Sequence, residues 1–195
     1  MSFVEQYFSE VINIASVIDK EKIENLTNAI KHVRDYGEGR VFVLGVGGSA
    51  GNAAHMVNDL RKLCGIEAYC PTDNVPELTA RTNDEGFDTV FEEYLRGSRF
   101  SERDAIFILS VGGGDEDRNV SVGLIKAIKY AKSVNGLVFG IVGKEDGYTA
   151  QNGDMVIVVP PVEPSRITPH SEAFQAVVWH CIISHPNLQI NKTKW

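Results

Sequence analysis

Three side chains that could bind a metal or move a proton stand out in this sequence. His55 and Asp59 lie four residues apart in a segment with a helical pattern, so they share one face of that helix. Such a pair suits a metal ligand set, or an acid and a base acting on a bound molecule, although it also fits a plain surface pair. His180 lies in the apolar stretch AVVWHCII, where a core histidine satisfied by a backbone carbonyl is the alternative to a functional role.

A glycine-rich segment precedes the His55 helix. Residues 45–49 read GVGGS and connect a buried strand to a helix. Glycine lets the backbone approach a ligand closely, and the free N–H groups of a helix start, together with the Ser49 hydroxyl, suit an anion. The spacing departs from the dinucleotide fingerprint, because Ala50 stands where its last glycine would be. The segment therefore predicts a site for a small anionic ligand such as a sugar phosphate, with a plain tight turn as the alternative.

A second glycine-rich segment follows another buried strand. Residues 110–114 read SVGGG and form a second candidate anion cradle. The acidic run at 115–117 would repel a phosphate unless it points away, and Arg118 could offset that charge with a bidentate contact. Asn119 and Ser121 place further polar groups before the next helix. A solvated, flexible acidic loop is the alternative interpretation.

Hydrophobic periodicity predicts the elements that must position these residues. Apolar residues at helical spacing predict helices over residues 3–18, 20–36, 50–63, 76–80, 87–95, 120–134 and 169–184, the last with Thr168 as its N-cap and Pro169 at its first position. Continuous apolar and β-branched runs predict strands buried on both faces over residues 40–46, 104–110, 137–142 and 154–159.

The order of these elements predicts the fold class. It reads helix–helix–β–α–(β)–α–α–β–α–β–β–α, with one strand uncertain, and such alternation indicates an α/β, doubly wound parallel sheet flanked by helices, a Rossmann-like three-layer sandwich. We expect one domain over 1–195, with an N-terminal helical segment at 1–37 and a polar, loosely held tail at 185–195. Ligands of such folds bind at the carboxyl ends of the strands, where both glycine-rich segments lie.

Composition limits the classes of partner. The chain has 195 residues, enough for one core without staples, and a net charge of −7 with no block of lysine or arginine. That balance argues against nucleic acid or an acidic membrane as partner. The three cysteines lack paired spacing, and the N-terminus lacks a signal pattern. The sequence also has no apolar run of about 20 residues. These features predict a cytoplasmic protein. The wide apolar stripe over residues 3–18 suggests packing against another subunit.

Taken together, the motifs resemble one known family. Residues 45–55 (GVGGSAGNAAH) are similar to the G-N-G-G-S-x-x-x-A-x-H opening of the phosphoheptose isomerases, members of the sugar isomerase (SIS) domain superfamily. Further landmarks follow in the family's order: NDEGF at 83–87, Ser110 where the family's S-T-S-G-N-S loop begins, VGKEDG at 142–147, and Arg166, Ile167 and His180 in the closing R-I-Q-E…H helix.

The resemblance implies a homotetramer with active sites between subunits. It implies a ketose–aldose isomerase that converts sedoheptulose 7-phosphate to D-glycero-D-manno-heptose 7-phosphate through an enediol, in many members with zinc held by His, Glu, Gln and His. Carried over by position, Asp59 is the base and His180 the acid, and the zinc ligands are His55, Asp59, Glu172 and His180. The substrate-binding residues expected on the same basis are Gly47, Gly48, Ser49, Asn83, Asp84, Ser110, Gly112, Gly113, Asn119, Ser121 and Glu172.

Several positions depart from the family pattern. The serine-rich loop has become 110–114 plus an acidic insertion, and Asp59 is one methylene shorter than the family's glutamate. The family's Gln corresponds to either Thr168 or Glu172, and counting back from His180 favours Glu172. Asn52 stands where some members have Asp. These changes keep a second hypothesis open: a non-catalytic SIS protein that binds a sugar phosphate or a protein partner.

Overall fold

The computed structural model describes residues 1–194; Trp195, the end of the expected tail, lies outside them. Its centre is a five-stranded sheet in which every neighbouring pair is parallel. The strands are β1 (Val41–Gly45), β2 (Ala68–Tyr69), β3 (Ala105–Ser110), β4 (Leu137–Val142) and β5 (Met155–Val158), in the spatial order β2-β1-β3-β4-β5. The order reverses beside β1, so the prediction of a doubly wound sheet is confirmed.

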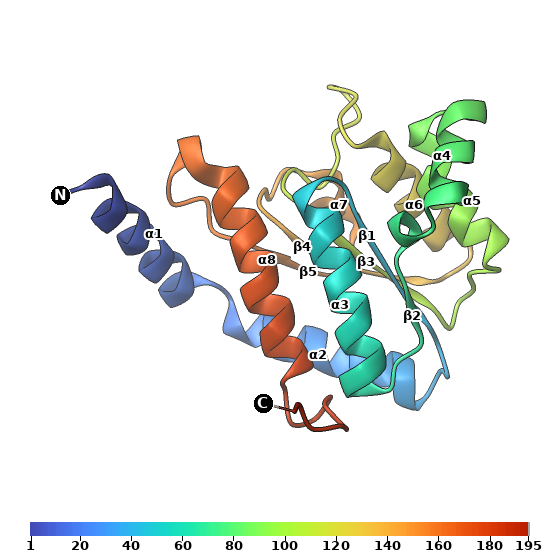
Figure 1. The fold of residues 1–195 in the computed structure, drawn as a ribbon, viewed down its shortest axis with the longest axis horizontal. Coiled ribbons are helices and arrows are strands. Elements are labelled where there is room, and N and C mark those ends of the chain that lie inside the picture. The colour runs from blue at the N-terminus through green and yellow to red at the C-terminus, as the bar shows by residue number, and fades with distance from the viewer. Residues whose placement is uncertain (195) are drawn as a thin grey trace.

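Helices cover both faces of the sheet, as Figure 1 shows. Along β1, Val41 and Val43 pack against the layer of α2 (Lys20–Asp35), α3 (Gly48–Cys64) and α8 (Ile167–Ile183). Phe42 and Leu44 point into the opposite layer. That layer holds α4 (Val75–Asp84), α5 (Val90–Gly97), α6 (Val122–Ser133) and α7 (Tyr148–Asn152). Burial on both faces explains the continuous apolar strands.

The predicted starts of two helices need correction. Helix α3 begins at Gly48, so Ser49 lies in its first turn rather than in a loop. Helix α8 begins at Ile167, directly after the 3₁₀ turn Pro164–Arg166, so Thr168 is not its cap. The first four N–H groups of a helix have no partner within it, and Pro169 therefore fits the third position as well as the first. The short α7 before β5 was missed.

Helix α1 (Phe3–Val17) projects from the body of the molecule (Figure 1). A capping box between Ser2 and Glu5 fixes its start. Its buried residue is Ile14, whereas large apolar side chains on the same helix stay exposed: Phe3, Val4, Phe8, Ile12 and Val17. An exposed apolar face of this extent marks an interaction surface.

The segment after α8 is held more firmly than expected. Leu188 is fully buried, and its carbonyl accepts a hydrogen bond of 2.7 Å from Arg34. The N–H groups of Ile190 and Asn191 donate to the carbonyl of Leu63. The chain is therefore attached to the ends of α2 and α3 as far as Asn191. Within residues 1–194, no helix is long and apolar enough to cross a membrane.

Candidate active site along the α3–α8 seam

Helices α3 and α8 run side by side on one face of the sheet (Figure 1). Their contact passes along one stripe of α3, formed by residues spaced three or four apart: Gly48, Asn52, His55 and Asp59. In the middle of this seam, the Asn52 amide donates to the Glu172 carbonyl at 3.0 Å and to the Gln175 side chain at 3.1 Å. These bonds set the register of the two helices.

One end of the seam carries a cluster of possible metal ligands. One ligand atom each from His55, Asp59 and His180 lies within 4.8 Å of the others. The imidazole Nε2 of His55 is 3.7 Å from Asp59 Oδ2, and the rings of His55 and His180 are 5.3 Å apart between centroids. Both histidines are exposed and the Asp59 side chain is 14% exposed. Residues 125 positions apart in the sequence thus meet at one accessible point.

A backbone contact fixes which nitrogen of His180 is available. Nδ1 of His180 lies 2.8 Å from the Ala176 carbonyl oxygen. A carbonyl oxygen accepts only, so Nδ1 carries the proton and Nε2 keeps its lone pair for a metal or a proton. The indole of Trp179 stacks on His180 at 3.5 Å and meets His55 edge-on at 4.8 Å. Since Trp179 is fully buried, it gives both rings a fixed surface.

Asp59 is oriented by its neighbour. The Asn58 amide donates to Asp59 Oδ1 at 2.8 Å, which leaves Oδ2 toward His55. Two imidazole nitrogens and one carboxylate oxygen suit Zn²⁺, whose nitrogen and oxygen ligands at about 2.1 Å lie roughly 3.4 Å apart in a tetrahedron. The 3.7 Å separation is close to that value. This donor set therefore fits zinc, with a fourth position open.

Glu172 lies at the other end of the seam. A Cβ placed on Gly48 would be 2.7 Å from the carboxylate carbon and both oxygens of Glu172, so the carboxylate lies over the first residue of α3. His180 is eight residues along the same helix, a rise of roughly 12 Å. Glu172 is not part of the group of ligand atoms formed by His55, Asp59 and His180, so this structure does not bring the expected zinc ligand Glu172 to the cluster. It faces α3, whereas Thr168 is exposed, so the geometry favours Glu172 over Thr168 as the family's Gln position.

The first glycine-rich segment makes a very short connection. Gly47 has φ +62 and ψ −128, a conformation that only glycine adopts readily, and it turns the chain from β1 into α3. The side chain of Ser49 is buried, and its hydroxyl oxygen accepts a hydrogen bond of 3.1 Å from Gln175. Ser49 thus joins α3 to α8 in this structure, and its own O–H remains a donor for an anion beside the backbone N–H groups of the helix start.

The second glycine-rich segment packs onto the start of α7. Ser110 accepts a hydrogen bond of 3.0 Å from the Gly113 N–H, and the Gly113 carbonyl accepts from the Thr149 hydroxyl at 2.7 Å. The acidic run follows this loop, and reciprocal backbone hydrogen bonds between Asp115 and Val120 close it into a turn. Gly112 continues the same turn, and a Cβ on Gly147 would meet its carbonyl oxygen at 2.0 Å, so these two loops are in close contact.

Two of the three acidic residues in the insertion, Asp115 and Glu116, pair with nearby cations. Arg118 binds Asp115 through Nε at 2.6 Å, and the backbone N–H and guanidinium of Arg118 hold the pKa of Asp115 below its usual range. Lys129 pairs with Glu116. Asn119 and Ser121 adopt positive φ angles of +54 and +53 at the start of α6. The insertion is therefore an ordered turn with its own countercharges.

Asn83 and Asp84 lie on the other side of the sheet from the α3–α8 seam. They end α4, on the opposite layer of the molecule from α3 and α8, and the Asn83 amide donates to Asp84 at 2.8 Å. Both side chains are exposed. Neither side chain therefore belongs to the seam formed by α3 and α8.

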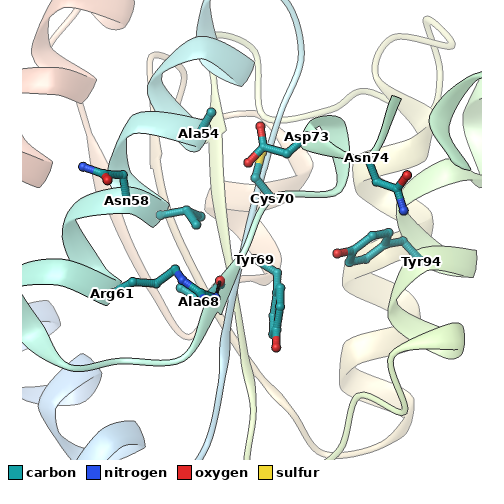
Figure 2. Close-up of a pocket in the computed structure, with 10 residues that line it drawn as sticks. Ala54, Asn58, Arg61, Ala68, Tyr69, Cys70, Asp73, Asn74 and Tyr94 are labelled. Atoms are coloured by element: carbon teal, nitrogen blue, oxygen red, sulfur yellow. Dashed lines mark hydrogen bonds between the residues drawn. The ribbon is translucent and has the colours of Figure 1, made fainter. Parts of the chain in front are cut away.

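A cavity of about 550 Å³ lies on the next face of α3, against the β2 edge of the sheet. Figure 2 shows Asn58 and Arg61 on its α3 wall and Tyr94 of α5 across from them. Arg61 is already engaged, since it donates to the Ala68 carbonyl at 2.9 Å and its guanidinium lies 5.6 Å from the Tyr69 ring centroid. Asn58 connects this cavity with Asp59 on the neighbouring face of the helix.

An ion-pair network fastens α1 near the Glu172 end of α8. Arg166 binds Glu10 in a bidentate manner at 2.9 and 2.6 Å, and Nε2 of His170 lies 2.7 Å from the same carboxylate. Hydrogen bonds from Arg166 and then His170 lower the pKa of Glu10 from 4.5 to about 2. The exposed apolar helix is therefore held by charge-assisted bonds next to the seam.

Sequence reasoning missed three contributors to this site. They are Asn58, Gln175 and Trp179. Gln175 had a readable signal, because a polar residue inside the run FQAVVW is expected to bond a buried partner. The backbone carbonyl considered as a partner for His180 is present, and it belongs to Ala176, four residues earlier on the same helix.

Comparisons with known proteins agree with this geometry. The SIS domain family model matches residues 6–143. Phosphoheptose isomerase of Mycobacterium tuberculosis is 31% identical over 194 residues, covering 93% of this chain and 91% of the relative. Phosphoheptose isomerase of Syntrophotalea carbinolica is 26% identical, covering 91% and 88%.

A solved structure gives the same fold. The phosphoheptose isomerase of Neisseria gonorrhoeae superimposes with a TM-score of 0.78 at 23% identity, covering 92% of this chain and 95% of that one. These matches favour the isomerase over a non-catalytic binding protein. The chain belongs to the SIS domain family and, within it, to the phosphoheptose isomerases, enzymes that isomerise sugar phosphates.

Proposed function

We propose that this enzyme interconverts sedoheptulose 7-phosphate and D-glycero-D-manno-heptose 7-phosphate at the exposed cluster of His55, Asp59 and His180. The observation that carries the proposal is the approach of their ligand atoms to within 4.8 Å of one another from two different helices. The names of the relatives support a heptose phosphate as substrate.

The reaction moves one proton between carbons and one between oxygens. Asp59 removes the proton from C1 of the ketose and returns it to C2, forming and consuming an enediol. In the neutral ring of His180, Nδ1 carries the proton toward the Ala176 carbonyl, so Nε2 can take the proton of the C1 hydroxyl and deliver it to the C2 oxygen. The sum is an isomerisation that needs no oxidant or reductant.

Zinc fits the same residues. His55, Asp59 and His180 would hold it, and a bound ion would take the Nε2 lone pair of His180, so its chemistry there would replace the proton-accepting role of that nitrogen by polarising the sugar carbonyl and stabilising negative charge on oxygen. Trp179 and Asn58 keep the rings and the carboxylate in place whether or not an ion is bound.

The spacing along α3 supports a long sugar chain. Six residues separate Ser49, in the first turn, from His55, which corresponds to roughly 9 Å along the helix axis. An extended seven-carbon chain matches this span when its phosphate lies at the helix start and its carbonyl at the cluster. Backbone N–H groups of Gly48 and Ser49 would bind the phosphate.

A homotetramer with active sites between subunits completes the proposal. The exposed apolar residues of α1 support packing between copies. The position of Asn83 and Asp84 on the opposite layer supports their acting on a neighbouring subunit's substrate.

Metal analysis combined with a heptulose phosphate isomerisation assay tests this function. We expect bound zinc and turnover in the native enzyme, and loss of turnover in Asp59→Asn and in His180→Ala. The exposed Glu102→Gln, at the amino end of β3, is a matched surface control. Turnover that survives both site substitutions contradicts the residue assignment, and ligand-induced stabilisation without any turnover would favour the binding role.

A further inference from the structure

A second cavity, of about 270 Å³, adjoins the metal-ligand cluster. Two members of the cluster, Asp59 and His180, line it. Its other lining residues come from the ends of α3 and α8 and from the end of the chain: Lys62, Leu63, Ile183, Ser184, Thr193 and Lys194. The cavity is therefore continuous with the candidate active site, on the side that faces away from Gly48.

Hydrogen bonds hold the chain end against this cavity. The side-chain amide of Asn191 donates to the Lys62 carbonyl at 2.9 Å, and the Asn191 N–H donates to the Leu63 carbonyl at 3.0 Å. Figure 1 shows the chain end, in red, next to the ends of α3 and α8. Thr193 and Lys194 follow within three residues of this attachment, so the chain end supplies one wall of the cavity.

The charged side chains that line the cavity are two lysines and one carboxylate. Lys62 follows Asp59 by three residues, so both lie on one face of α3, about 4.5 Å apart along its axis. Within residues 1–194, Lys62 makes no ion pair that would neutralise it. The cavity accordingly places an excess of positive charge beside the residues proposed to transfer protons.

Positive charge at this point matches the chemistry proposed above. When Asp59 removes the proton from C1, negative charge develops on the oxygens of the sugar. With the phosphate at the start of α3, the C1 end of the sugar lies at the cluster and faces the cavity. An ammonium group beside that oxygen stabilises the transition state more than the bound ketose, because the charge is absent from the ketose.

We propose that Lys62 and Lys194 donate hydrogen bonds to the C1 oxygen of the substrate and stabilise the enediolate, so that the end of the chain forms part of the active site. The proposal rests on the function proposed above, in which the carbonyl end of the sugar lies at the cluster. It gives a catalytic role to a segment that follows the last helix of the domain.

The test compares Lys62→Met and Lys194→Met with the native enzyme. Methionine removes the ammonium group and keeps most of the side-chain length, and both lysines are exposed, so neither change opens a cavity in the core. Lys192→Met is the matched control, because it removes the same charge from the same exposed segment at a residue that does not line the cavity.

The measurements are kcat and KM for sedoheptulose 7-phosphate, the Tm, and the Kd of two probes. One probe is the hydroxamate of a six-carbon aldonic acid 6-phosphate, which carries an oxygen at both positions of the enediolate. The other is the corresponding amide, which lacks the oxygen equivalent to that on C1. The difference between the two probes isolates the interaction with the C1 oxygen.

We expect each of the two variants to lower kcat about tenfold and to weaken hydroxamate binding by a similar factor, as for the loss of one charge-assisted hydrogen bond. Amide binding and the Lys192→Met control should be unchanged. A lysine in the last turn of a helix also stabilises the helix end, so a lower Tm with unchanged kcat and unchanged probe binding would overturn the proposal.

Equal effects of Lys194→Met and Lys192→Met would overturn it as well, because the effect would then come from net charge alone. If the native enzyme does not isomerise the sugar, the proposed function fails. The ratio of hydroxamate to amide affinity still decides whether the two lysines bind an oxygen at this place.

Discussion

The contact between Asn58 and Asp59 offers a sharp test of the metal-ligand cluster. Replacing Asn58 by alanine removes the 2.8 Å hydrogen bond that orients the Asp59 carboxylate and leaves all three proposed ligands in place. Asn58 is exposed, so the substitution neither opens a cavity nor removes a buried bond. Any change in metal affinity then reports on the orientation of Asp59.

The size of the effect follows from the exposure of this bond. Loss of a partner that orients a metal ligand costs about 10- to 100-fold in affinity. Because Asn58 is exposed and water can replace part of the bond, we expect the lower end, about tenfold, which corresponds to about 1.4 kcal/mol. Turnover should fall by a comparable factor at limiting zinc and recover when zinc is in excess.

Competition titration of zinc into metal-free enzyme measures this affinity, with the fluorescence of Trp179, stacked on His180, as a second signal. Glu102→Gln, at an exposed residue before the amino end of β3, is the surface control. Unchanged affinity in Asn58→Ala, with zinc binding abolished in His180→Ala, would refute the orienting role. Unchanged affinity in both variants would refute the metal site itself.

Three further outcomes are expected. Folding lowers the pKa of Glu10 from 4.5 to about 2, so the stabilisation of α1 by this carboxylate is complete above pH 4.5 and is lost as the pH falls toward 2. Hydrogen exchange in α1 should therefore accelerate between pH 4.5 and 2. The Glu10→Gln variant should show fast exchange in α1 already at pH 7. Burial raises the pKa of Cys64 to about 11. A thiol reagent at pH 8 should therefore modify the exposed Cys181 first and Cys64 only on unfolding. Equal rates of modification at the two cysteines would contradict this expectation. Asp104→Ala removes the nearly buried carboxylate that binds Arg40 at 3.0 and 2.8 Å. The free energy of unfolding, measured by urea denaturation, should fall by about 3 kcal/mol. A loss below about 1 kcal/mol would show that solvent already screens the pair.

Strands β1, β3 and β4 could be predicted because they are buried on both faces and therefore read as continuous apolar runs. Four of the five strands were expected within one residue of their observed ends, and helices α1 and α2 likewise. The short β2 and α7 were harder to identify because they have two and five residues, too few to show a period. The start of α8 was misjudged because Pro169 fits any of the first positions of a helix.

The meeting of His55 with Asp59 could be predicted from helical spacing alone, since it depends only on the backbone geometry of α3. Their approach to His180 could not, because it depends on how α3 and α8 pack across 125 residues of sequence; family resemblance supplied the pairing instead. The involvement of Ser49 with Gln175, and the place of the Glu172 carboxylate over Gly48, were likewise beyond sequence reasoning. Both are outcomes of side-chain packing between two helices.

The stripe of Gly48, Asn52, His55 and Asp59 places both ends of the candidate site, Gly48 and the metal-ligand cluster, on one rigid helix, α3. Distances between functional groups on a helix change in whole turns of about 5.4 Å, not continuously. In the proposed function, this stripe therefore fixes one distance between the anion and the carbonyl. Adapting such an enzyme to a shorter sugar would mean moving a ligand residue by one turn, so a single helix would measure the length of the sugar chain.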